Sequence, residues 1–157
     1  MPSSISPAVD LVAFEEGFRN NVYLCPAGYP TIGFGRRVII LDYNTHEVIT
    51  IPVTRKGEEE NLRLRLNAIA NWLEAKYPWF ALLSPQRQAV LISLAYQVGN
   101  DGFTRFRAMI RALAKDDFKE AAREYLDSTA ARQCPLRFAR GNAILRDNLS
   151  ISEALEL

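Results

Sequence analysis

Three side chains near the start of the chain have the chemistry and spacing of a reactive site: Glu16, Cys25 and Thr31. Eight residues separate the carboxyl from the thiol, and five separate the thiol from the hydroxyl. A carboxyl can donate a proton, and a hydroxyl can hold a water molecule because it both donates and accepts hydrogen bonds. A free thiol has a pKa near ~8.5, so Cys25 is mostly neutral unless its surroundings lower that value.

The residues before Glu16 predict how its carboxyl is presented. Ser6, the expected N-cap, precedes a proline, and Gly17 is typical of a helix end. Val9, Val12 and Glu16 recur at spacings of three and four, so they share one helical face. A carboxylate that continues an apolar stripe is costly unless it is paired. We therefore expect Glu16 to emerge from this helix into a cleft.

Short strands and then helices are expected after this first helix. Residues 18–54 are rich in glycine, proline, aromatic and β-branched residues, and the strand candidates are 22–24, 31–34, 38–41 and 48–51, with a turn at 42–45. The later pattern is helical, with helices expected at 54–77, 84–99, 103–114, 116–127 and 136–147.

These elements predict an α+β fold that is predominantly α. It consists of a first helix (1–17), a small antiparallel β lobe (18–54), a connecting helix (55–77) and a larger helical lobe (78–157). A cleft between two such lobes is the expected place for a ligand.

Composition and charge narrow the class of protein. The chain has 157 residues, of which 48% are hydrophobic and 24% charged, as in a globular domain with a sizeable core. A net charge of +1 gives no electrostatic case for a nucleic-acid partner. The sequence shows no signal peptide and no apolar run of membrane-spanning length, so we expect folding in the cytoplasm without membrane insertion. No cluster has metal-ligand spacing, and no cofactor is expected.

The spacing of Glu16, Cys25 and Thr31 resembles that of the phage lysozymes, or endolysins, of glycoside hydrolase family 24. The segment 95–99, followed by Phe103 and Phe106, resembles the helix-turn-helix element that lines the cleft in that family. The resemblance covers most of the chain in the right order. It implies one lysozyme-like domain with two lobes around a cleft. It also implies a muramidase that cleaves the β-1,4 bond between N-acetylmuramic acid and N-acetylglucosamine, with inversion.

The resemblance assigns a role to each of the three reactive residues. Glu16 is expected to donate the proton to the leaving oxygen, for which a carboxyl facing a cleft is suited by a raised pKa. Thr31 is expected to hold the attacking water. Cys25 stands where the family more often has aspartate, and we expect it to position the water with weak base assistance.

Further residues match positions that face the sugar in the family. These are Tyr96 and Gln97, with Phe34 and Gly35 assigned to the same substrate-binding surface. A tyrosine on a helix is as readily a core residue, so both interpretations of Tyr96 stay open. Arg137 lies where the family carries a basic partner of the catalytic carboxylate, and the alternative for it is a solvated charge.

The second cysteine, Cys134, aligns near a loop that borders the mouth of the cleft, opposite Cys25. One hypothesis is a redox pair, in which a disulfide staples the cleft and blocks catalysis. The alternative is two unrelated free thiols, since a bridge needs Cα atoms within about 7 Å.

Three functional hypotheses remain. The first is a monomeric phage or prophage muramidase that passes from the host cytoplasm to the periplasmic wall with the help of a holin. The second is a lysozyme-fold module that binds peptidoglycan or protein with weakened activity; Cys25 and Arg36, which replaces a histidine of the family, leave it open. The third is a virion-associated lysozyme.

Overall fold

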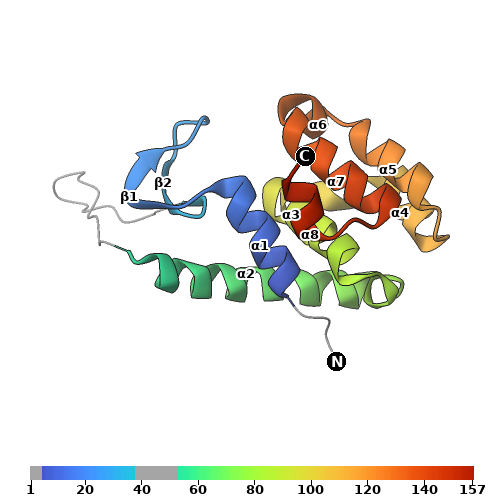
Figure 1. Ribbon diagram of the computed structural model, residues 1–157, viewed down its shortest axis with the longest axis horizontal. Helices are drawn as coiled ribbons and strands as arrows, with labels where there is room; N and C mark the ends of the chain where they lie inside the picture. Colours follow the sequence, from blue (N-terminus) through green and yellow to red (C-terminus); the bar gives the residue numbers. More distant parts are fainter. Residues whose placement is uncertain (1–4, 38–52) are drawn as a thin grey trace.

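The computed structural model describes residues 5–37 and 53–157, which form a strand-containing lobe and a larger helical lobe (Figure 1). The elements are α1 (Ser6–Glu16), β1 (Arg19–Leu24), β2 (Pro30–Gly33), β3 (Arg36–Arg37), α2 (Arg55–Lys76), the 3-10 turn η1 (Phe80–Leu82), α3 (Pro85–Thr104), α4 (Arg107–Ala114), α5 (Phe118–Leu126), α6 (Thr129–Gln133), α7 (Pro135–Asp147) and α8 (Ile151–Leu155). This arrangement confirms the expected α+β, predominantly α fold.

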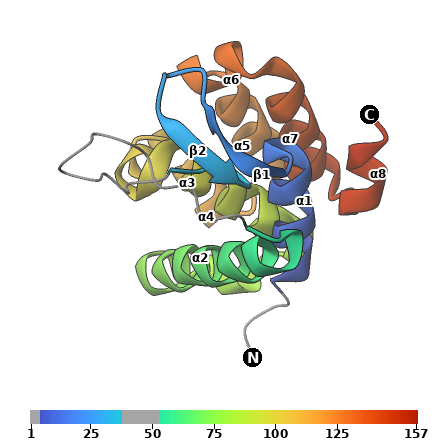
Figure 2. The same cartoon turned by 90° about the vertical axis from the view of Figure 1, so that its left-hand side faces the viewer.

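Helix α2 runs beneath both lobes, and α1 lies between the strands and the remaining helices (Figure 1). Figure 2, viewed from the β-lobe end, shows the strands in front of the helical lobe with α2 below them. Helix α1 packs against α2, α3 and α8, so its C-terminal end is held where the two lobes meet. No helix in the described ranges is long and apolar enough to cross a membrane.

The sheet places several side chains on one face. Its order is β1-β2-β3, antiparallel throughout, with Tyr23 opposite Thr31 and Thr31 opposite Arg37. Residues directly opposite each other share a face, so these three side chains form a row across the sheet. Ile32, the next residue along, faces the other way and is buried.

The strands expected at 22–24 and 31–34 are confirmed within β1 and β2, while the two-residue β3 is too short for a period-2 pattern to reveal. The candidates 38–41 and 48–51 and the turn 42–45 lie outside the described residues.

The start of α1 differs from the prediction. Ile5 has helical backbone angles and is the N-cap, and Ser6 is the first helical residue. The helix therefore begins at the expected cap, one position earlier than predicted, and has no side-chain cap hydrogen bond. At the other end, Gly17 has φ 67° and is the C-cap, as expected, so Glu16 is the last residue of the helix.

The later helices agree with the predicted ones except near Gly99. That glycine has φ 80° and ψ 163°, which kinks α3, but the chain re-enters the helix and continues to Thr104. Helix α4 consequently begins at Arg107 and not at 103. The short η1, α6 and α8 span too few residues to show a helical period, and the sequence did not predict them.

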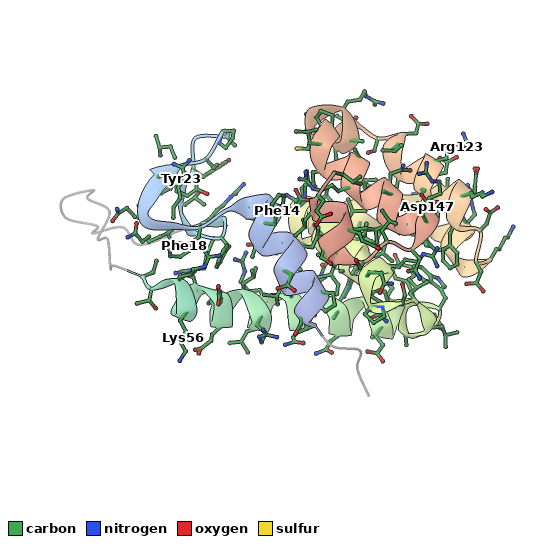
Figure 3. The ribbon with its side chains drawn as sticks, in the orientation of Figure 1. Phe14, Phe18, Tyr23, Lys56, Arg123 and Asp147 are labelled. Carbon is green, nitrogen blue, oxygen red and sulfur yellow. The ribbon has the colours of Figure 1, made fainter. Side chains whose placement is uncertain are left out.

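The hydrophobic core lies in the helical lobe and extends to the β lobe through Phe34. Its largest fully buried side chains come from α2, α3, α4 and α7 together with the turn after β2, and include Leu66, Leu94, Phe103, Leu113, Phe138 and Phe34. The Phe18 ring, labelled in Figure 3, lies 5.3 Å from the Phe34 ring. The core therefore fixes the sheet relative to the helices.

Candidate active site

A cavity of about 760 Å³ lies between the β lobe and the helical lobe. Its described lining residues come from α1, the sheet, α2, α3 and α7, and are Glu16, Arg19, Tyr23, Cys25, Pro26, Thr31, Gly35, Arg36, Arg37, Arg65, Tyr96, Gln97 and Arg137. The fold thus brings together all three residues expected to carry chemistry. It also places at this cavity three of the four expected substrate-binding residues and the expected partner of Glu16.

Glu16 is held at one carboxylate oxygen by Arg137. The guanidinium Nη1 donates to Oε1 at 2.9 Å, and Nη2 donates to the Ser93 hydroxyl at 3.0 Å. Both side chains are largely sheltered, with 22% of Glu16 and 13% of Arg137 exposed. A charge-assisted hydrogen bond of this kind orients the carboxyl while leaving part of it open to the cavity.

The other oxygen of Glu16 lies against the backbone of Gly35. A Cβ atom at position 35 would stand 2.8 Å from Oε2, closer than a normal non-bonded contact. Gly35 also has φ 78°, a conformation that glycine adopts without steric cost. The turn after β2 therefore passes close to the carboxyl because this residue has no side chain.

The surroundings of the Cys25 thiol are set by a tight turn between Cys25 and Tyr29. The Cys25 N–H donates to the Tyr29 carbonyl at 3.0 Å, and the Tyr29 N–H points back to the Cys25 Sγ at 3.4 Å. This N–H is the main reason that the pKa of the Cys25 thiol is lowered from its ordinary value. Partial burial opposes that shift, whereas the Ala27 N–H, the Thr31 hydroxyl and the Arg37 cation support it.

Thr31 lies beside this thiol in β2 and is only 2% exposed. Its hydroxyl donates to the Tyr29 carbonyl at 2.8 Å. The hydroxyl oxygen retains lone pairs that can accept a hydrogen bond. Cys25 and Thr31 are thus both ordered by Tyr29 at the cavity wall.

Tyr96 both packs against the core and lines the cavity, so the two alternatives for it are not exclusive. Its hydroxyl donates to the Phe34 carbonyl at 2.7 Å and accepts from Arg65 Nη1 at 2.9 Å. Burial is the largest cause that raises the pKa of Tyr96, which keeps the hydroxyl protonated as a donor. Tyr96 therefore joins α3 to the β lobe and to α2.

Phe34 does not take the place expected for a substrate-binding side chain. Its ring is 2% exposed in the core, so it cannot contact a ligand in the cavity. The apolar ring gains more from burial against Phe18 than from facing a polar cleft. Phe34 contributes to the site through its carbonyl, which orients Tyr96.

The two cysteines are both free in the structure. Cys134 accepts a hydrogen bond from Gln97 Nε2 at 3.5 Å and packs against the core, and it is not among the described lining residues of the cavity. Gln97 lines the cavity and contacts Cys134, so it lies between the two. The proposed Cys25–Cys134 pair remains a prediction.

Two partly buried ion pairs next to the cavity were not predicted as pairs. Glu15, which the helical period directs away from the face of Glu16, receives two hydrogen bonds from Arg140, at 2.6 and 3.2 Å. Arg36 donates twice to Glu58 of α2, at 2.6 and 3.1 Å. The second pair ties β3 to α2.

Sequence reasoning also missed the cavity arginines Arg19, Arg37 and Arg65. No alternation marks Arg37 in the sequence, because β3 has only two residues; its pairing with β2 places it on the face of Thr31. Arg65 resembles any solvated helix charge in sequence, and nothing local distinguishes it.

Comparisons with known proteins agree with this geometry. A family model described as phage lysozyme matches residues 13–135. The protein named "Probable T4-type lysozyme 1" from Dictyostelium discoideum is 21% identical, with 87% of this chain and 91% of that protein aligned. The family match spans Glu16, Cys25, Thr31, Tyr96 and Gln97, and both comparisons support a muramidase-like function. The chain belongs to the phage lysozyme family.

Proposed function

We propose that this protein is a peptidoglycan muramidase that hydrolyses the β-1,4 bond between N-acetylmuramic acid and N-acetylglucosamine. The observation that carries the proposal is the convergence of Glu16, Cys25 and Thr31 on one cavity between the lobes. Family membership supplies the reaction class, and the cavity supplies a place for a glycan strand. Glycoside hydrolysis needs a proton donor and a means of placing water, and these residues provide both.

In the proposed mechanism Glu16 donates its proton to the glycosidic oxygen. Arg137 fixes Oε1, while Oε2 has no hydrogen-bond partner among the described residues and lies beside Gly35 at the cavity. The bond between the anomeric carbon and the leaving oxygen breaks as that proton arrives. Tyr96, Gln97 and Gly35 contact the glycan in this proposal and hold the bond near the acid.

The water that completes the reaction is held by Thr31 and Cys25. The Thr31 hydroxyl oxygen accepts a hydrogen bond from the water. The Cys25 thiolate takes the other water proton as the water oxygen bonds to the anomeric carbon, which leaves a neutral thiol and the new hydroxyl group. Attack from the face opposite the leaving group inverts the configuration. The lowered pKa of Cys25 strengthens this role, because the thiolate fraction at neutral pH exceeds that of an ordinary thiol.

Substitution of Cys25 tests this role for the thiol. Cys25→Ala is expected to lower the turnover rate at pH 7 about tenfold or more, whereas Cys25→Asp retains it, because aspartate is ionised above pH ~4 and is a base. Wild-type activity is expected to rise with pH as the thiol ionises, at lower pH than for an ordinary thiol. The Cys25→Asp variant lacks that rise above pH about 6. Initial rates between pH 5 and 9 measure this, and full activity in Cys25→Ala would contradict the role.

Substitution of Gly35 tests the placement of the carboxyl. Gly35→Ala forces a methyl group against Glu16 Oε2, so activity is expected to fall about a hundredfold, as for a 1 Å displacement of a catalytic group. Gly99→Ala is the matched control, since Gly99 has a similar φ of 80° but no atom within 4 Å of an added Cβ. Both variants are expected to lose stability through the strained backbone. Only Gly35→Ala is expected to lose more activity than the decrease in its folded fraction explains. Equal activities in the two folded variants would show that Gly35 does not position Glu16.

The proposal includes a biological setting. A phage or prophage origin, access to the periplasmic wall through a holin, and action as a monomer all rest on the family. A virion-associated lysozyme shares the same chemistry, and a binding module shares only the fold.

The experiment that tests the proposed function uses purified peptidoglycan. A muramidase releases new reducing ends as the suspension clears, whereas a binding module co-sediments with the wall and releases none. The enzymatic proposal would be refuted if folded, wall-bound protein released reducing ends no faster than buffer alone.

A further inference from the structure

The cavity has a strong excess of positive charge. Among its described lining residues, five are arginines and one is acidic, whereas the whole chain has a net charge of +1. A cleft lined by one sign of charge focuses its electric field on whatever enters. The uneven distribution therefore points to an anionic group on the ligand.

Two of these five arginines are already neutralised. Arg137 pairs with Glu16, and Arg36 pairs with the buried Glu58. Arg19, Arg37 and Arg65 have no carboxylate within salt-bridge distance in the ranges 5–37 and 53–157. Some exposed arginines elsewhere in the described ranges do have such a partner, as Arg55 does with Glu59.

Each of these three guanidinium groups lies over a tyrosine ring. The distances from the guanidinium carbon to the ring centre are 4.4 Å for Arg19 on Tyr23, 4.0 Å for Arg37 on Tyr29 and 4.8 Å for Arg65 on Tyr96. Stacking restricts the plane of each group but leaves N–H donors at its edge for hydrogen bonds. These arginines are therefore partly ordered before a ligand arrives.

Their positions place them along the wall where the reactive residues lie. Arg37 is paired across the sheet with Thr31, and Tyr23, on which Arg19 stacks, is opposite Thr31 on the other side. Arg65 reaches the cavity from α2 and bonds the Tyr96 hydroxyl. The three arginines therefore frame the cavity from the sheet and from α2.

We propose that Arg19, Arg37 and Arg65 bind carboxylates on the glycan and so select acidic peptidoglycan over neutral N-acetylglucosamine polymers. The planar guanidinium matches a carboxylate through two parallel hydrogen bonds, and a neutral sugar offers no such partner. In peptidoglycan the carboxylates come from stem peptides, or from the lactyl groups where the peptides have been removed. This inference rests on the proposed function and adds its substrate selectivity.

The test compares matched glycans. Three proteins are assayed: the wild type, the double variant Arg19→Gln/Arg37→Gln and the control Arg63→Gln. The substrates are intact peptidoglycan and glycan strands freed of peptides, each with and without chemical amidation of its carboxylates. A neutral chitin oligosaccharide is the uncharged reference substrate. Arg63 lies on the same helix as Arg65 but lines a different cavity, so its substitution removes one charge without touching the site. Both sheet substitutions are on exposed residues, which preserves folding. Binding of a soluble acidic muropeptide, measured by calorimetry, accompanies the rates.

The wild-type protein is expected to favour acidic over amidated glycan by about ten- to a hundredfold in kcat/KM, the range for charge-assisted hydrogen bonds. In the double variant the ratio of kcat/KM on acidic to kcat/KM on amidated glycan is expected to be near one, and muropeptide affinity is expected to fall by about the same factor. Arg63→Gln is expected to change neither the ratio nor the affinity. Loss of the preference on amidating intact walls identifies stem-peptide carboxylates, and loss only on amidating the freed strands identifies the lactyl groups. The inference is overturned if wild type and double variant show the same ratio and the same affinity. Failure of the proposed function is a different result, in which no glycan is cleaved, and the binding measurement still decides the role of the arginines.

Discussion

Replacing Glu16 with glutamine is expected to lower turnover on peptidoglycan by about a thousandfold, within the range for loss of a general acid. Glutamine keeps the size of the side chain, and its carbonyl oxygen still accepts from Arg137, so the fold is retained. The amide cannot give a proton to the leaving oxygen. The loss therefore appears in kcat much more than in KM, because the glycan contacts remain.

Reducing-end release from purified walls measures this effect, with wall co-sedimentation to show that Glu16→Gln still binds. Glu59→Gln is a suitable control, because Glu59 is a partly exposed carboxylate of α2 that pairs with Arg55 and does not line this cavity. Near-normal rates in Glu16→Gln would refute the assignment of Glu16 as the acid. A loss of wall binding in parallel with rate would instead indicate a role in binding.

Truncation of Arg140 is expected to destabilise the fold by about 3 kcal/mol, the cost of leaving a buried charge without its partner. The Glu15 side chain is 4% exposed, and Arg140 of α7 donates both hydrogen bonds to it. Arg140 also lies 5.0 Å over the Phe14 ring, so Arg140→Ala removes a packing contact in addition to the charge. The effect falls on stability, because this pair is not part of the cavity lining.

Urea unfolding measures that loss, and two comparisons define its cause. The double variant Glu15→Met/Arg140→Met is expected to be more stable than Arg140→Ala, since it removes both charges and fills their volume with apolar atoms. Arg123→Ala, on the helical lobe well away from Tyr23 in Figure 3, is expected to leave the unfolding midpoint nearly unchanged because its ion pairs are exposed to solvent. Equal midpoints for Arg140→Ala and Arg123→Ala would show that the Glu15 pair contributes nothing.

The parts of this site that could be predicted from the sequence depend on local patterns. The helical period placed Glu16 at an apolar face, Gly17 marked the helix end, and the spacing to Cys25 and Thr31 carried the family resemblance. Each of these signals lies within a few turns of chain, where residue type and spacing determine geometry.

The parts that could not be predicted depend on contacts between distant segments. Glu15 and Arg140 are separated by 125 positions, and Arg65 and Tyr96 by 31, so no local pattern pairs them. Phe34 was misplaced because an aromatic residue between two glycines is compatible with either a cleft or a core. Only the packing of Phe18 against it decides for the core. The grouping of Arg19, Arg37 and Arg65 at the cavity could not be predicted, because net charge is a sum over the chain and does not show where the charges lie.

The most direct test of the proposed function is the identity of the sugar at each new reducing end. Purified peptidoglycan is digested with the wild-type protein, reduced with borohydride and analysed by mass spectrometry, with Glu16→Gln as the control. The account predicts reduced N-acetylmuramic acid at the new ends, at a rate that falls about a thousandfold in the control. Reduced N-acetylglucosamine at those ends, or an undiminished rate with Glu16→Gln, would contradict it.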